Sequence, residues 1–99
     1  MAKLRLSTAA QRDLRQIQAD GAEKFGVPTS LGHMAKFDRL FALLREQPFA
    51  GPARPDYGKA VRLLTNPPHR ILYQVQGELV VIIRILHASR DVHRAMGRR

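Results

Sequence analysis

The apolar residues of this chain change their spacing once, and that change predicts the two halves of the fold. In the first half they recur every three or four residues, as on one face of a helix: Ala10, Leu14, Ile17, Gly21 and Phe25. From about residue 60 onward the chain is instead rich in residues that favour β-strands. Residues 48–58 between them hold three prolines and two glycines, which predicts a loop. We therefore expect a helical first half followed by a β-sheet.

Two helices are expected in the first half. The first covers about residues 8–25 and opens with a capping box formed by Thr8 and Gln11. The second begins at Thr29 or Ser30, either of which can cap it, and ends before a proline. Because the connection is short, the helices should form an antiparallel hairpin. The buried face of the second helix is marked by Met34, Phe37, Phe41 and Leu44.

Four strands are expected around this hairpin. The first covers residues 3–6 and should lie at a sheet edge, because basic and apolar residues alternate in it. The others are expected at residues 60–64, 70–76 and 79–86. The fold class is therefore α+β, with the element order β-α-α-β-β-β and the helical hairpin on one face of a small, mainly antiparallel sheet.

Gly77-Glu78 predicts a two-residue hairpin turn between the last two strands. The turn would place Val75 opposite Val80, Tyr73 opposite Ile82 and Ile71 opposite Arg84. The last strand is apolar on both faces, as expected of a central strand that is covered on both sides.

Length and charge restrict the functional classes. The chain has 99 residues, so we expect a single domain over residues 1–99, with residues 93–99 as a flexible basic tail. Its net charge of +9 favours an acidic protein or a nucleic acid as partner. The absence of cysteine permits a reducing compartment, and no segment is apolar enough for a signal peptide or a membrane span. A cytoplasmic protein with no membrane partner is therefore predicted.

No cofactor or metal site is predicted. The four histidines, His33, His69, His87 and His93, lack the helical i, i+4 spacing of zinc motifs. His33 is interpreted as solvated and His69 as a turn residue. Nucleophile-elbow and phosphate-loop motifs are also missing. The eight acidic residues are scattered, and Asp13 and Asp38 are expected in surface ion pairs.

Arg62 and Arg84 each interrupt an apolar strand. A guanidinium group in such a position must reach solvent or be paired, because burying it alone costs several kcal/mol. One hypothesis is that both point to the sheet face without helices and line a cationic docking surface. The alternative is that one of them forms a structural ion pair with Asp91 or Asp56.

An ordered set of residues, spread over about residues 3–92, resembles the RelE/ParE superfamily of type II toxin–antitoxin toxins. The most specific part is His-Arg-Ile-x-Tyr at residues 69–73, followed by Arg-Ile-Leu-His-x-x-Arg-Asp at residues 84–91. The other matching positions are Leu6, Ser7, Ala10, Asp13, Leu14, Ile17, Phe25, Gly26, Leu40, Leu44, Pro48, Gly51, Arg54, Val61, Arg62 and Ile83.

The resemblance implies a small basic bacterial toxin that an acidic antitoxin neutralises by wrapping over its helices and sheet. Members contribute to plasmid stabilization and growth inhibition. ParE-like members poison DNA gyrase by protein–protein contact and are not nucleases, whereas RelE-like members cut mRNA on the ribosome without a metal. Leu86-His87-Ala88-Ser89-Arg90-Asp91 is more similar to the ParE branch, so a gyrase inhibitor that is not an enzyme is the leading hypothesis.

The partner-binding residues predicted from this hypothesis are Arg62, Arg84, His87, Arg90 and Arg94. The alternative is a RelE-like endonuclease acting on ribosome-bound mRNA. Its catalytic residues would be Arg62, Arg84 and Arg90 as cations and His93 as the acid–base group. His93 stands where RelE-like members usually carry a tyrosine. Gln18 and Asp20 stand where ParE-like members often carry an aromatic pair.

A second alternative is a non-toxic, basic nucleic-acid-binding module. Its two helices would be a helix-turn-helix, but Phe37 and Phe41 mark the second helix as part of the core.

Overall fold

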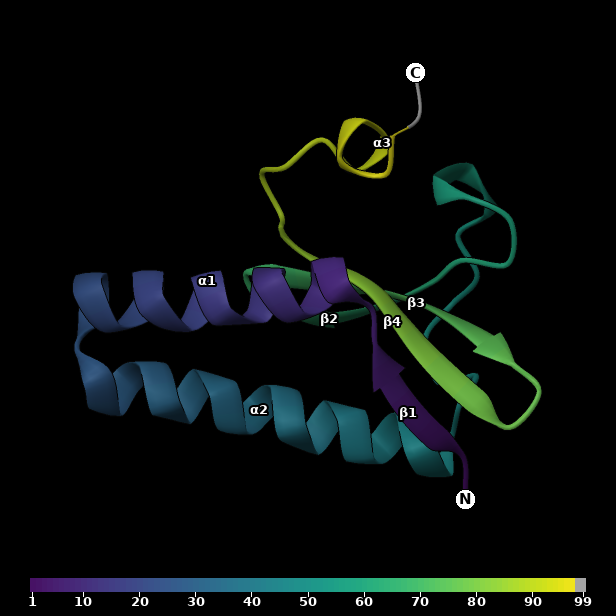
Figure 1. Ribbon diagram of the computed structural model, residues 1–99, viewed down its shortest axis with the longest axis horizontal. Helices are drawn as coiled ribbons and strands as arrows, with labels where there is room; N and C mark the ends of the chain where they lie inside the picture. The colour runs from purple at the N-terminus through teal and green to yellow at the C-terminus, as the bar shows by residue number, and fades with distance from the viewer. Residues whose placement is uncertain (98–99) are drawn as a thin grey trace.

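The computed structural model describes residues 1–97 and has the predicted α+β architecture (Figure 1). A strand is followed by two long helices, then by three further strands and a final short helix. No helix in this part of the chain combines the length and apolarity that crossing a bilayer requires. The elements are β1 (Lys3–Leu6), α1 (Thr8–Phe25), α2 (Val27–Glu46), η1 (Pro55–Tyr57), β2 (Arg62–Asn66), β3 (His69–Gln76), β4 (Leu79–His87) and α3 (Val92–Ala95).

The four strands form one mixed sheet in the order β1-β4-β3-β2, which confirms that β1 lies at an edge. β1 runs parallel to β4, while β2, β3 and β4 are antiparallel neighbours. Leu4 and Leu6 of β1 pack against the core, whereas Lys3 and Arg5 are exposed. The predicted alternation of basic and apolar side chains is therefore confirmed.

α1 has the predicted bounds but a different cap. Ser7, not Thr8, caps the helix: its Oγ accepts a hydrogen bond from the Ala10 N–H at 3.0 Å and donates one to the Ile83 carbonyl at 2.7 Å. The side chain of Gln11 donates to the Leu6 carbonyl instead of closing a capping box. The cap therefore also ties the start of α1 to β4.

α2 begins at Val27, two residues before the predicted Thr29. Gly26 turns the chain with a positive φ of 88°, and Pro28 occupies the first turn of α2, where a missing N–H costs nothing. Ser30 is therefore inside the helix, where its hydroxyl donates to the Gln18 carbonyl at 2.9 Å. A Cβ at Gly21 would lie 3.1 Å from the Ser30 Oγ, so this glycine permits the close approach of the two helices.

The turn and register between β3 and β4 are only partly as predicted. Val75 lies opposite Val80 and Tyr73 opposite Ile82, which confirms the predicted turn at Gly77-Glu78. A bulge at Leu72/Tyr73 then shifts the register, so Arg84 lies opposite Leu72 and the predicted pairing with Ile71 is wrong. β2 begins at Arg62 instead of residue 60, because Ala60 has a positive φ of 59° that does not fit a strand.

Both faces of the sheet are covered, by two separate clusters. The first lies between the helical hairpin and the sheet, with Phe37, Phe41, Ile71, Tyr73 and Ile82 among its buried members. The second lies on the other face, where η1 and α3 cover the sheet (Figure 1). Its buried members are Tyr57, Val61, Leu72, Leu86 and Val92. The face that was expected to be open is therefore partly closed by the loop after α2 and by the C-terminal segment.

α3 occupies the start of the predicted tail. Val92 is buried, and the Asp91 carboxylate caps the helix by accepting from the Arg94 N–H at 3.2 Å. Arg98 and Arg99 lie outside the described residues. The flexibility predicted for residues 93–99 stays a prediction.

Candidate functional site: a groove beneath the helical hairpin

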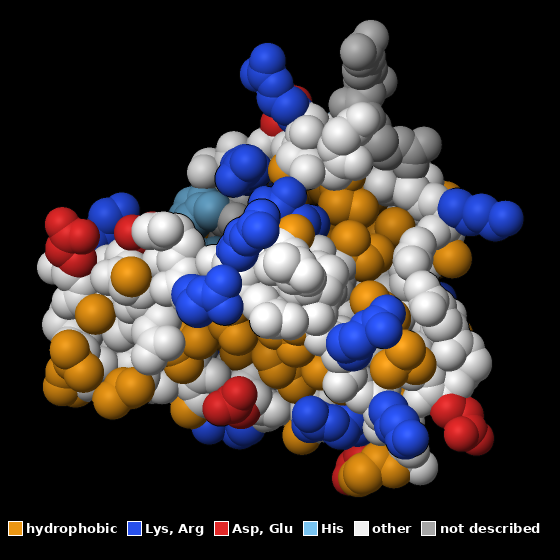
Figure 2. Space-filling model, viewed as in Figure 1, with side chains coloured by type: hydrophobic (Ala, Val, Ile, Leu, Met, Phe, Trp, Pro, Cys, Tyr) orange, Lys and Arg blue, Asp and Glu red, His pale blue; other side chains and the backbone are white. Residues whose placement is uncertain are grey.

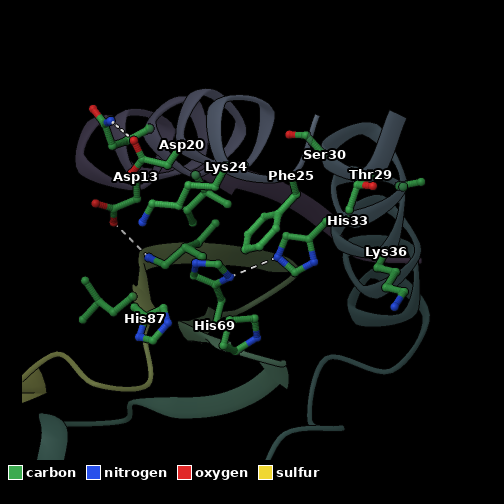
Figure 3. Close-up of a pocket in the computed structure, with 18 of the residues that line it drawn as sticks. Asp13, Asp20, Lys24, Phe25, Thr29, Ser30, His33, Lys36, His69 and His87 are labelled. Atoms are coloured by element: carbon green, nitrogen blue, oxygen red, sulfur yellow. Dashed lines mark hydrogen bonds between the residues drawn. The ribbon is translucent and has the colours of Figure 1, made fainter. Parts of the chain in front are cut away.

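A groove of about 960 Å³ lies where the hairpin extends past the end of the sheet (Figure 3). α1 contributes residues from Asp13 to Phe25, and α2 contributes residues from Thr29 to Arg39. The opposite wall is formed by the start of β3 and the end of β4, with Arg90 beyond them. The groove forms because the apolar stripes of the two helices extend beyond the end of the sheet that they cover.

The groove combines an apolar interior with a cationic rim. Ile17, Ala35, Ile85 and Leu86 contribute apolar surface. Of the two acidic residues in the lining, Asp13 is paired with Arg84, and Asp20 accepts a hydrogen bond from Gln16 at 2.9 Å. The basic residues of the lining are Lys24, Lys36, Arg39 and Arg90. Such a surface suits an amphipathic segment that carries carboxylates beside its apolar face.

The apolar surface continues onto the end of the hairpin. Phe25 is 70% exposed, Val27 58% and Leu31 53%. Figure 2 shows hydrophobic side chains gathered at this end of the molecule, and Lys and Arg side chains in a run between α1 and the C-terminal segment. Exposed large apolar side chains that adjoin a groove are typical of a protein interface.

Arg84 is held inside the protein. Its Nε and Nη2 donate to the Asp13 carboxylate at 2.7 and 2.9 Å, and its Nη1 donates to the Ala95 carbonyl at 2.9 Å. The same carboxylate accepts from the Ile85 N–H at 2.9 Å. The hydrogen bonds that Arg84 donates to Asp13 raise the pKa of the guanidinium above its usual value, so Arg84 remains charged. Arg84 therefore links α1, β4 and α3, and its acidic partner is neither Asp91 nor Asp56.

Arg62 lies on the other face of the sheet from Arg84. It is opposite Tyr73, a member of the cluster beneath the helices, whereas Arg84 is opposite Leu72 in the second cluster. The Nε of Arg62 donates to the Gly51 carbonyl at 2.7 Å, and its guanidinium lies 5.1 Å from the centre of the Phe49 ring. The hypothesis that both arginines line the face without helices is wrong at Arg62, which lies on the face of Tyr73 beneath the helices, whereas the bulge in β4 places Arg84 on the face of Leu72.

The remaining predicted site residues fall into two groups. His87 and Arg90 line the groove. His93 and Arg94 are exposed on α3, where the His93 ring lies 5.4 Å from the Tyr57 ring. Asp56 of η1 forms an ion pair with Arg54 at 2.9 Å. The structure therefore does not bring Arg62, Arg84, Arg90 and His93 together as one catalytic group.

A pair of histidines on the groove wall was not expected. His33 of α2 and His69, the first residue of β3, face each other with 3.0 Å between Nε2 and Nδ1 (Figure 3). Burial, followed by the charges of His33 and His87, lowers the pKa of His69 to about 4. Burial and the charge of Lys36 lower the pKa of His33. Both rings are therefore neutral at pH 7. Spacing along the chain gives no signal for this pair, because it forms only when α2 packs on the sheet.

Comparison with known proteins identifies the family. The family described as the ParE toxin of the type II toxin–antitoxin system, parDE, matches residues 4–92 of this chain. The chain belongs to this family of ParE toxins. Toxin ParE3 of Caulobacter vibrioides is 29% identical over 87 residues, which cover 88% of this chain and 87% of that protein. Toxin ParE1 of the same organism is 27% identical over 97 residues, which cover 98% of this chain and all of that protein.

Solved structures support the same assignment. A chain from the chromosomal ParDE toxin–antitoxin system of P. aeruginosa matches with a TM-score of 0.76 and 25% identity, over 88% of this chain and 96% of that chain. A chain from the toxin–antitoxin complex RelBE2 of Mycobacterium tuberculosis matches with a TM-score of 0.61 and 26% identity, over 87% and 96% of the two chains. The fold class and the resemblance predicted from the sequence are confirmed.

Proposed function

We propose that this ParE-family toxin is neutralised by an acidic cognate antitoxin and that, when released, it inhibits DNA gyrase in the cytoplasm by protein–protein contact. The observation that carries the proposal is the match to the ParE family over residues 4–92, in a chain whose groove has the chemistry of a peptide-binding surface. Inhibition by contact needs no catalytic group. The engagement of Arg62 and Arg84 in structural hydrogen bonds agrees with this requirement.

The antitoxin is expected to place an amphipathic segment in the groove beneath the helical hairpin. Its apolar side would pack on Ile17 and Ile85, and its carboxylates would meet Lys36 and Arg39 on the rim. Opposite charges at such a rim accelerate association and suppress binding to other partners. The net charge of +9 extends this attraction beyond the contact itself.

The test is induction of the chain in bacteria, with and without the neighbouring acidic open reading frame. Growth arrest that is relieved by the second frame, with linear DNA from trapped gyrase, is the expected result. Unchanged DNA topology together with shortened messages would refute gyrase as the target and favour the ribosome-dependent endonuclease.

A charge-reversal pair tests the groove separately from the target. Lys36→Glu with Arg39→Glu should leave the growth arrest intact while weakening rescue by the antitoxin. Lys3→Glu with Lys59→Glu is the matched control, since it reverses two exposed lysines that do not line the groove and changes the net charge by the same amount. Equal rescue of the groove variant and the control would contradict the proposed docking site.

The endonuclease alternative has less support from the geometry. It requires Arg62, Arg84, Arg90 and His93 to act on one phosphodiester, whereas Arg62 and Arg84 lie on opposite faces of the sheet. RNA cleavage by the unmodified chain that is lost in His93→Ala would instead support the endonuclease alternative. The nucleic-acid-binding alternative is weakened further, because Phe37 and Phe41 of α2 are buried against the sheet.

A further inference from the structure

His33 and His69 stand out from the rest of the groove because two imidazole nitrogens converge there, and no acidic side chain within residues 1–97 forms a hydrogen bond with either ring. The residues are 36 positions apart in the chain, and their ring centres are 5.1 Å apart with an angle of 42° between the planes. Figure 3 shows the two rings approaching each other from α2 and β3 at the wall of the groove. Their ligating atoms are therefore placed by two rigid elements.

The distance between the two nitrogens matches the requirement of a shared metal ion. Metal–imidazole bonds are about 2.1 Å long, so two nitrogens at right angles around one ion lie about 3.0 Å apart. The observed separation of Nε2 and Nδ1 is 3.0 Å. An ion that takes the place of the shared hydrogen bond, while the proton moves to the other nitrogen of its own ring, therefore requires little change in this distance. Right-angled positions occur in the octahedral and square-planar geometries preferred by nickel(II) and copper(II).

Both imidazoles have a free lone pair at neutral pH, because burial lowers the pKa of each. The Phe37 ring packs on both, with ring centres 5.0 Å from His33 and 5.9 Å from His69, and limits their rotation. His87 is not counted as a ligand, because its Nδ1 accepts a hydrogen bond from the Ser89 N–H and its proton therefore lies on Nε2.

We propose that His33 and His69 bind one divalent cation of the later first-row transition metals, with water in the remaining positions. Within residues 1–97 no cluster of three or more histidines and acidic residues is close enough to enclose a metal, so this is an open, two-ligand site. No metal site was predicted from the sequence, because the histidines lack the spacing of zinc motifs along the chain. The fold nevertheless brings His33 and His69 together. The proposal does not depend on the identity of the toxin's target.

The first test uses the unmodified chain and nickel(II) as the probe. Because nickel(II) is paramagnetic, the imidazole proton signals nearest the ion should broaden first in an NMR titration. We expect the signals of His33 and His69 to broaden at substoichiometric nickel, while the exposed His93 on α3 stays sharp. Simultaneous broadening of all four histidines would indicate an adventitious ion only and would overturn the proposal.

Calorimetric titration of variants provides the second test. His33→Gln and His69→Gln should each weaken nickel binding by about tenfold or more, since losing a ligand costs at least as much as losing a residue that orients one. The matched control is His93→Gln, which should bind as the unmodified chain does. Melting curves verify that each variant is folded. His33→Gln is decisive if His69→Gln does not fold, and undiminished binding by folded His33→Gln would refute the site.

Discussion

Replacing Asp13 with alanine should destabilise the protein severely, because this carboxylate joins α1 to β4 and holds the Arg84 side chain that reaches α3. It accepts hydrogen bonds from Arg84 Nε and Nη2 and from the Ile85 N–H, at 2.7, 2.9 and 2.9 Å. The side chains of Arg84 and Asp13 are only 19% and 14% exposed. Removal of one partner of a buried ion pair costs about 3–5 kcal/mol, and partial exposure reduces this to about 2–3 kcal/mol here. For a domain of this size, that loss corresponds to roughly 8–24 °C in melting temperature.

The assay is urea unfolding followed by circular dichroism, with Asp38→Ala as the control. Asp38 is exposed on α2, so its loss should change the free energy of unfolding by less than about 0.5 kcal/mol. The double substitution Asp13→Leu with Arg84→Met should recover much of the loss, because no charge is then left buried without a partner. If Asp13→Ala unfolds at the same urea concentration as Asp38→Ala, the structural role assigned to the pair is refuted.

Three further substitutions test the packing of the loop after α2 and of the hairpin, each by the free energy of unfolding in urea. Gly51→Ala should lose about 2–4 kcal/mol, because a Cβ there would clash with the Leu63 carbonyl and lie 2.9 Å from Tyr73 Cε1; an unchanged midpoint would contradict the close approach. Gly32→Ala should instead gain up to about 1 kcal/mol, since it lies within α2, where an added Cβ would meet nothing within 4 Å in residues 1–97 beyond its own helix backbone and chain neighbours; a loss would show that this helix face is occupied. Tyr73→Phe should lose about 1–2 kcal/mol, because the buried Gly51 N–H then loses its acceptor at 2.8 Å; full stability would mean that this hydrogen bond contributes nothing.

Local patterns predicted the elements, since they depend on periodicity and on residues that interrupt it. The apolar stripe of α1 gave both of its bounds, and Gly77-Glu78 gave the β3–β4 turn. The predicted start of α2 lies two residues beyond the observed one, because Pro28 is tolerated in the first turn of a helix. The cap is Ser7 and not Thr8, and the Ser7 hydroxyl also donates to the Ile83 carbonyl of β4, a contact that local spacing does not reveal.

The site was less predictable because it depends on contacts between residues that are distant in the chain. His87 and Arg90, which were predicted to bind a partner, both line the groove. Arg84 was correctly singled out as needing a partner, but Asp13 lies 71 residues away and no local rule pairs them. The bulge at Leu72/Tyr73 adds one residue to β4, so the Arg84 side chain points to the opposite face of the sheet from the one that the predicted pairing with Ile71 implies. The alternation of side chains along a strand does not reveal such an added residue.

The central claim, that this ParE-family toxin acts on gyrase by contact, is tested most directly with purified components. Gyrase, supercoiled plasmid and ATP are incubated with the full chain, and the DNA is separated after protease treatment. The account predicts linear plasmid that increases with the dose of the chain and disappears when the cognate antitoxin is added first. Full supercoiling activity with no linear product, at a dose that arrests growth in cells, would contradict it.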